Sequence, residues 1–128
     1  MQTLVISKDQ FLINTFSTES SASFTDTTIF NDSSDPLDII SLVHSLTPNL
    51  LIFDDDLLQP NSSKILKSIK QISKNVRIIF LTSDNSIDLG REISPMGVYF
   101  YGIKPISQQE LLNLINSVSA NNKSITYS

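Results

Sequence analysis

Residues 48–60 read PNLLIFDDDLLQP, and this stretch decides the fold. Its apolar run at 50–53 is typical of a strand covered on both faces, as in a parallel sheet between helix layers. Asp54, Asp55 and Asp56 follow without a spacer. Three adjacent carboxylates repel one another, so the triplet costs stability unless a cation, hydrogen bonds or solvent relieves it. Ligands of open α/β sheets bind at such strand ends, which makes the triplet a candidate site; the alternative is an acidic loop turning toward Pro60.

Length and charge limit the class of protein. The chain has 128 residues, of which 40% are hydrophobic and 17% charged, and this suits one globular domain. A net charge of −4 gives no basic footprint for nucleic acid or an anionic membrane. The absence of cysteine excludes disulfides, thiolate metal sites and cysteine nucleophiles. The first apolar run is too short for a signal peptide and no stretch reaches the ~18 apolar residues of a membrane span, so we expect a cytoplasmic protein.

Strand and helix patterns alternate along the sequence. The strand-like apolar runs lie at 3–6, 24–30, 50–53, 76–81 and 98–103. The helix-like patterns lie at 9–16, 36–46, 61–72, 87–93 and 107–118. This alternation predicts an α/β fold, a doubly wound five-stranded parallel sheet with helices on both faces. We expect one domain at 1–120, followed by a polar tail or linker at 121–128.

Three chemically useful side chains end consecutive strands of this predicted sheet. Asp54 ends the third strand, Thr82 the fourth and Lys104 the fifth. Because the carboxyl ends of parallel strands lie at one edge, all three are expected to meet there.

This ordered set resembles the CheY-like receiver domain of two-component response regulators, a flavodoxin-like fold, over about residues 3–120. The resemblance implies that Asp54 is the phosphoacceptor and that Lys104 steadies the phosphoryl oxygens. It also implies that Thr82 is the switch hydroxyl and Tyr101 the switch aromatic. A histidine kinase is then a candidate partner.

The sequence departs from the receiver pattern where magnesium would bind. Receivers carry an acidic pair after the first strand, and Ser7 and Lys8 fill those places here, with Asp9 the only acid nearby. Mg²⁺ prefers carboxylate and water ligands, so we expect no cofactor, or weak Mg²⁺ binding by Asp54, Asp56 and Asp9. Lys8 is expected either to act as a fixed cation beside Asp54 or to extend outward into solvent.

A second departure concerns the acceptor itself. The receiver pattern has a proline four residues after the phosphoacceptor, but Leu58 stands at that distance from Asp54, and Pro60 stands four residues after Asp56. Either Asp54 or Asp56 is therefore a candidate acceptor, with Asp55 a further acidic-pocket position.

Three functions compete. We favour a degenerate, non-enzymatic receiver acting as a protein-interaction module, because losing the acidic pair removes the metal that phosphoryl transfer needs. The alternative is a receiver phosphorylated on Asp54. The third is a phosphatase resembling the haloacid dehalogenases, suggested by Asp54 and Asp56 in IFDDDLL. That family needs further acids downstream, and Glu110 is the only one after Lys104.

The fifth strand carries three aromatic residues in succession: Tyr99, Phe100 and Tyr101. Neighbouring side chains on a strand point to opposite faces, so one helix layer cannot bury all three. We expect Tyr99 or Phe100 to join a partner or self-association surface with the last helix, because aromatics are enriched at interface hot spots. The alternative is that helices on both faces make the rings ordinary core.

Overall fold

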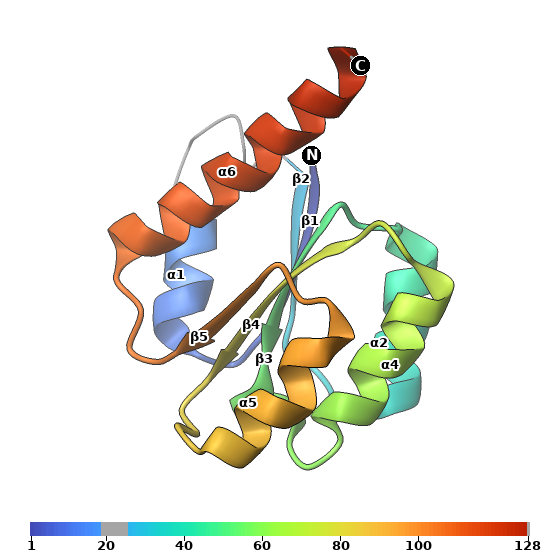
Figure 1. Cartoon of the computed structure of the whole chain (residues 1–128), viewed down its shortest axis with the longest axis vertical. Coiled ribbons are helices and arrows are strands. Elements are labelled where there is room, and N and C mark those ends of the chain that lie inside the picture. The colour runs from blue at the N-terminus through green and yellow to red at the C-terminus, as the bar shows by residue number, and fades with distance from the viewer. Residues whose placement is uncertain (19–25, 128) are drawn as a thin grey trace.

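The chain folds around a five-stranded parallel sheet in the order β2-β1-β3-β4-β5 (Figure 1). The computed structural model describes residues 1–18 and 26–127, with 121–127 as backbone only. The strands are β1 (Gln2–Ile6), β2 (Asp26–Phe30), β3 (Leu50–Asp54), β4 (Arg77–Thr82) and β5 (Phe100–Ile103). The predicted sheet is therefore confirmed. The second strand, expected at 24–30, is found at 26–30, and 24–25 lie outside the described residues.

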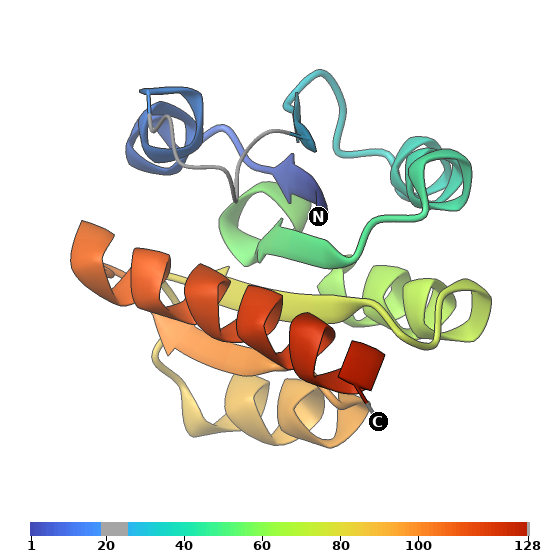
Figure 2. The same cartoon turned by 90° about the horizontal axis from the view of Figure 1, so that it is seen from above.

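Helices cover both faces of the sheet, as Figure 1 and the view from above in Figure 2 show. One layer consists of α1 (Gln10–Thr18) and α6 (Gln108–Tyr127). The other consists of α2 (Pro36–Leu46), α4 (Ser62–Ile72) and α5 (Ile87–Ile93). Two short elements, α3 (Asp55–Leu58) and the 3-10 turn η2 (Ser94–Met96), were not expected from the sequence. No helix in the described residues is long and apolar enough to cross a membrane.

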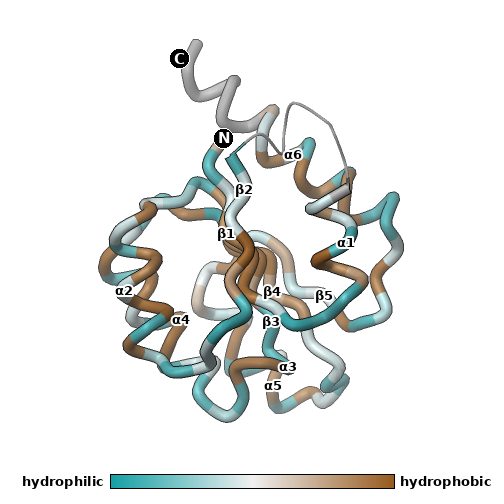
Figure 3. Tube along the Cα trace, turned by 180° about the vertical axis from the view of Figure 1, so that it is seen from behind, coloured by the Kyte–Doolittle hydropathy of each residue, from teal (hydrophilic) through white to brown (hydrophobic). Residues whose placement is uncertain are grey.

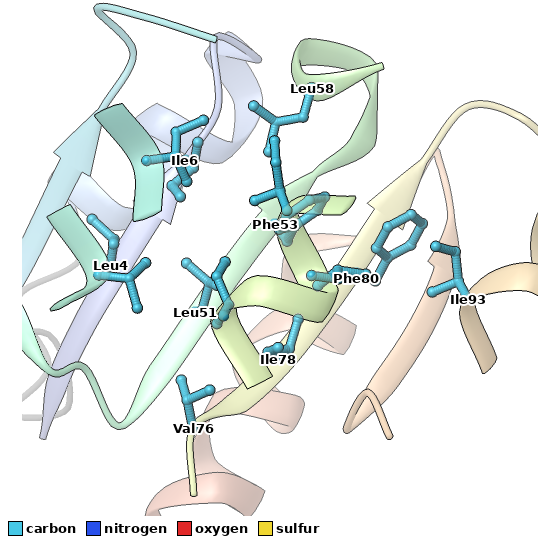
Figure 4. Packing of buried hydrophobic residues seen from close by; sticks show 14 residues of the cluster. Leu4, Ile6, Leu51, Phe53, Leu58, Val76, Ile78, Phe80 and Ile93 are labelled. Carbon is cyan, nitrogen blue, oxygen red and sulfur yellow. The ribbon is translucent and has the colours of Figure 1, made fainter. Parts of the chain in front are cut away.

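Alternation along the strands divides the core into two clusters. Ile78 and Phe80 of β4 face the layer of α2, α4 and α5, while Ile79 and Leu81 face α1 and α6. Figure 4 shows the first cluster, in which Phe53 and Phe80 stack with ring centroids 5.4 Å apart. The hydrophobic strands in the centre of Figure 3 reflect this double cover. Each fully buried aliphatic or aromatic side chain contributes about 1.5–3 kcal/mol to the stability of the fold. The apolar side chains on both faces of the strands therefore hold the sheet between the two helix layers.

Local signals place the helices as the sequence predicts. Asp35 accepts a hydrogen bond from the Leu37 amide and precedes Pro36 at the first position of α2. The Ser107 hydroxyl accepts one from the Glu110 amide at the start of α6. The side chain of Asp54 accepts the Asp56 amide and so caps α3. The acidic triplet therefore both ends a strand and begins a helix.

Candidate functional site

The predicted residues Asp54, Thr82 and Lys104 lie at the carboxyl ends of three neighbouring strands, β3, β4 and β5. Asp54 lies opposite Leu81, and Thr82 lies opposite Ile103, the residue before Lys104. Figure 3 labels α3 and α5 at this end of the sheet. The parallel pairing of the strands is therefore enough to bring these three residues to the same edge of the sheet.

The centre of the site is the ammonium group of Lys104. Its Nζ lies 2.9 Å from Oδ1 of Asp54, 3.0 Å from Oδ2 of Asp9 and 3.0 Å from Oδ2 of Asp56. We call these four residues the Lys104 cluster. The exposed fraction of the Asp54 side chain is 3%, against 28% for Asp9 and 33% for Asp56. Lys104 therefore neutralises part of an acidic site whose central carboxylate is shielded from water.

Each carboxylate in the cluster has further donors. Oδ2 of Asp54 accepts a 2.5 Å hydrogen bond from the Ser7 hydroxyl, and Oδ1 accepts one from the Asp56 amide as well as from Lys104. Oδ1 of Asp56 accepts the Ser83 amide, and Oδ2 accepts the Ser83 hydroxyl. Ser83 was not among the predicted site residues, although it directly follows Thr82 at the end of β4.

These contacts shift the protonation equilibria of the cluster. Burial opposes the charge on Lys104, but hydrogen bonds with Asp54, Asp9 and Asp56 outweigh burial and raise the pKa of its ammonium group. Burial also opposes ionisation of Asp9 and Asp56. Hydrogen bonds, chiefly from Lys104 to Asp9 and from Ser83 to Asp56, nevertheless lower the pKa of both carboxyl groups.

Linkage then fixes the pH window in which the cluster stabilises the fold. A lowered carboxyl pKa adds stability above the unfolded value, here 3.8, and that stability is lost as the pH falls through the folded pKa. A raised lysine pKa adds stability below the unfolded value, here 10.5, and that stability is lost as the pH rises through the folded pKa. The cluster therefore contributes fully between these two values.

Asp55 does not belong to this cluster, so the expectation that it shares the acidic pocket is wrong. It is 1% exposed, and its carboxylate accepts hydrogen bonds from the side chains of Gln59, Ser62 and Thr82. Thr82 therefore contacts Asp55 rather than Asp54. Alternation past the end of β3 sends adjacent side chains to opposite faces, and that signal was available in the sequence.

The two residues in place of the acidic pair behave differently. Ser7 is buried and donates to Asp54, while its Oγ accepts the Asp9 amide. Lys8 is exposed, and every ion pair in the described residues is made by Lys104. The interpretation of Lys8 as a cation beside Asp54 is therefore wrong, and its outward alternative is confirmed.

The three aromatics of the fifth strand lie half-buried. Tyr99 and Phe100 pack against the hydrophobic core cluster under α1 and α6. The hydroxyl groups of Tyr99 and of Ser117 on α6 are hydrogen-bonded to each other. Tyr101 packs on the other face and stacks on Phe80, with centroids 5.3 Å apart. Burial, followed by the charges of Asp84 and Asp55, raises the pKa of Tyr101.

A cavity of about 370 Å³ opens beside the cluster. Its lining combines an apolar wall with a polar end: Asp9, Phe11, Leu12, Ser83, Lys104, Pro105 and Ile106. This cavity is a route by which a group from solvent or from a partner can reach Lys104.

Mg²⁺ does not fit the site as it stands. The oxygens that would bind the ion are already accepting hydrogen bonds, and Lys104 lies among the three carboxylates. No group of three acidic, histidine or cysteine side chains in the described residues has the geometry to hold a metal ion. Metal binding would first require Lys104 to move.

Comparison with solved structures identifies the fold. The chain matches the response regulator receiver domain protein (CheY-like) from Methanospirillum hungatei JF-1 with a TM-score of 0.77, covering 96% of this chain and 97% of that chain at 16% identity. The chain has the fold of CheY-like receiver domains. The receiver (REC) domain of AraT from Geobacillus stearothermophilus also gives a TM-score of 0.77, with 98% and 97% covered and 13% identity.

Comparison of sequences found a partial match to a curated protein. Sporulation initiation phosphotransferase F of Bacillus subtilis (strain 168) is 25% identical over 79 residues, or 62% of this chain. The match spans 64% of that relative, which is less than two thirds of its length. No family model matches the sequence.

Removing the lysine should destabilise this receiver fold. We expect Lys104→Met to lower the free energy of unfolding by about 3 kcal/mol at pH 7, because three carboxylates lose their cation. The loss should shrink below about pH 4 as Asp9 and Asp56 become protonated. Urea unfolding at both pH values measures this. The exposed Lys8→Met is the matched control, expected within about 0.5 kcal/mol of the parent. An equal loss at both pH values for Lys104→Met would contradict the electrostatic explanation.

The same pair of variants tests the metal. Lys104→Met frees carboxylate oxygens and removes a positive charge, so it should bind Mg²⁺ about tenfold more tightly than the parent. Lys8→Met removes an equal charge at an exposed position and should match the parent. Titration calorimetry decides the order. Tight binding by the parent that is lost on Asp54→Asn would show instead that Lys104 yields to the ion.

Proposed function

We propose that this chain is an atypical response regulator receiver domain that acts as a cytoplasmic protein-interaction module of two-component signalling and is impaired in Mg²⁺-dependent phosphorylation. The contact of Lys104 with Asp9, Asp54 and Asp56 carries this proposal. Phosphoryl transfer to a carboxylate needs positive charge on the transferring oxygens. Here the one cation in the described site is already shared among three carboxylates.

The condition of Asp54 supports the same function. An attacking carboxylate oxygen has to reach phosphorus, but Asp54 is 2% exposed, and three donors hold its two oxygens in place. The 2.5 Å bond from Ser7 withdraws electron density from Oδ2 and so weakens that oxygen as a nucleophile. Ser7 stands where receivers carry an acid, and its hydrogen bond stabilises the Asp54 carboxylate in its unreacted state.

Phosphorylation on Asp54 is the second candidate. Lys104 bonds Asp54 directly and lines the cavity beside it, so a small phosphodonor or a histidine kinase has a route to the pair. Asp56 is the alternative acceptor because it is the more exposed carboxylate. We do not retain the phosphatase, since the strand order 2-1-3-4-5 is that of flavodoxin-like receivers.

The partner surface is proposed on β5 and α6. β5 is an edge strand, and its Ile103 is 47% exposed. Beside it lies a cavity of about 210 Å³ that Phe100, Tyr101 and Ile106 help to line. A partner protein or a second copy that packed on this edge would bury Ile103 and the outer side of Phe100.

Intact mass spectrometry after incubation with acetyl phosphate tests the proposed function. We expect little or no phosphoryl adduct on the parent, and no increase with Mg²⁺, because the ion does not displace Lys104. Asp54→Asn and Asp56→Asn locate any adduct. A Mg²⁺-dependent adduct on most of the parent molecules, absent from Asp54→Asn, would replace this proposal with the phosphorylatable receiver.

The surface has its own test. Tyr99→Ser, Phe100→Ser and Ile103→Ser should each weaken self-association or partner capture severalfold by removing buried apolar area. Leu37→Ser is the control, because Leu37 is 73% exposed but lies on α2. Analytical ultracentrifugation and pull-down against the parent are the measurements. If the β5 variants stay folded and keep the parent's mass and partners, this surface must be abandoned.

A further inference from the structure

Asp55 is a buried carboxylate without an ion pair in the described residues. It is 1% exposed, and the ion pairs described all involve Lys104. Its charge is met by three hydrogen bonds instead. Ser62 donates to Oδ1 at 2.5 Å, while Gln59 and Thr82 each donate to Oδ2 at 2.7 Å. A buried carboxylate with no cation depends on each of these donors.

The hydroxyl group of Thr82 is fully used by this arrangement. It has a single proton, which it donates to Asp55, and its oxygen accepts the Asp84 amide at 3.0 Å. Thr82 is itself 0% exposed, so water does not compete for the proton. While the bond to Asp55 lasts, Thr82 has no proton to give to any other acceptor.

The bond also holds Thr82 on one side of the sheet. Thr82 continues the alternation of Ile78 and Phe80, which face the layer of α2, α4 and α5. Asp54 continues the alternation of Leu50 and Ile52, which face α1 and α6. The donor at the end of β4 and the central carboxylate of the Lys104 cluster therefore belong to opposite faces.

We propose that Asp55 is a positioning residue that holds the Thr82 hydroxyl away from Asp54. A phosphoryl group on Asp54, or a mimic of one, gains Thr82 as a donor only when the bond between Thr82 and Asp55 breaks. The part of this inference that concerns Asp54 rests on the proposed function, whereas the part that concerns Thr82 does not.

Tyr101 supports the idea of an exchange of donors at Asp55. Its ring stacks on Phe80, on the same side of the sheet as Thr82. Its hydroxyl group is buried and has no hydrogen-bond partner in the described residues. A spare buried donor on that side offers Asp55 a replacement once Thr82 has turned.

The experiment measures the side-chain rotamer of Thr82 by NMR in full-length protein labelled on threonine methyl groups, with Thr82→Val identifying the signal. The parent should show the couplings of a single rotamer. Asp55→Leu removes the acceptor, although its side chain is larger, and should give averaged couplings. Asp55→Ala is the second variant if the leucine variant does not fold, because it also removes the acceptor and adds no bulk.

Ser62→Ala is the matched control, since it removes a donor to the other oxygen of the same carboxylate and leaves Thr82 its partner. It should keep the parent's rotamer. A single rotamer in both Asp55 variants, or averaging in Ser62→Ala equal to theirs, would overturn the positioning role.

A second readout connects Thr82 to Asp54. Trifluoroberyllate with excess Mg²⁺ mimics a phosphoryl group on a carboxylate, and half-saturation should need about tenfold less of it for Asp55→Leu than for Ser62→Ala. Equal affinities would overturn the coupling to Asp54. If no variant takes up the mimic, phosphoryl chemistry is absent, and the rotamer result alone decides the role of Asp55.

Discussion

The ammonium group of Lys104 lies within 3.0 Å of carboxylates from the β1–α1 loop, the end of β3 and the first turn of α3. Without it, Asp9, Asp54 and Asp56 would repel one another at an edge where Asp54 has almost no access to water. The cation is carried by the residue that follows β5, so one side chain joins three segments that are distant in sequence. The geometry of the acidic edge therefore depends on this contact more than on any other polar interaction in the described residues.

Strand alternation is the second constraint, because it divides three identical neighbours between two environments. Asp54 and Asp56 reach Lys104, while Asp55 points into the side of the sheet where Ser62 and Thr82 supply hydroxyl donors. One carboxylate group is thus stabilised by a cation and the other by neutral donors. The same residue type gains different properties from the direction in which the backbone presents it.

The fold could be predicted from the sequence because strands covered on both faces are continuous apolar runs, such as LLIF at 50–53 and IIFL at 78–81. The meeting of Asp54 and Lys104 followed from parallel strand order alone. The sequence did not determine that Lys8 points outward and Asp9 inward, because these directions depend on where β1 ends and on how the following loop turns. Thr82 was placed on the correct strand, but its partner Asp55 was missed, although strand alternation puts these two side chains on the same face of the sheet.

A tethered ammonium group differs from a bound metal ion in one respect that matters for signalling. Mg²⁺ leaves and returns with concentration, so a metal-dependent site can be filled or emptied, whereas Lys104 is held by its own chain at the end of β5. Its three carboxylate partners raise its pKa, so it stays charged throughout the physiological range. The charge of the acidic edge is therefore nearly constant. In the proposed function, changes in this molecule then have to come from contacts with other proteins. Lys104 directly follows the edge strand β5, so a partner that binds β5 can shift Lys104 and thereby alter the cluster.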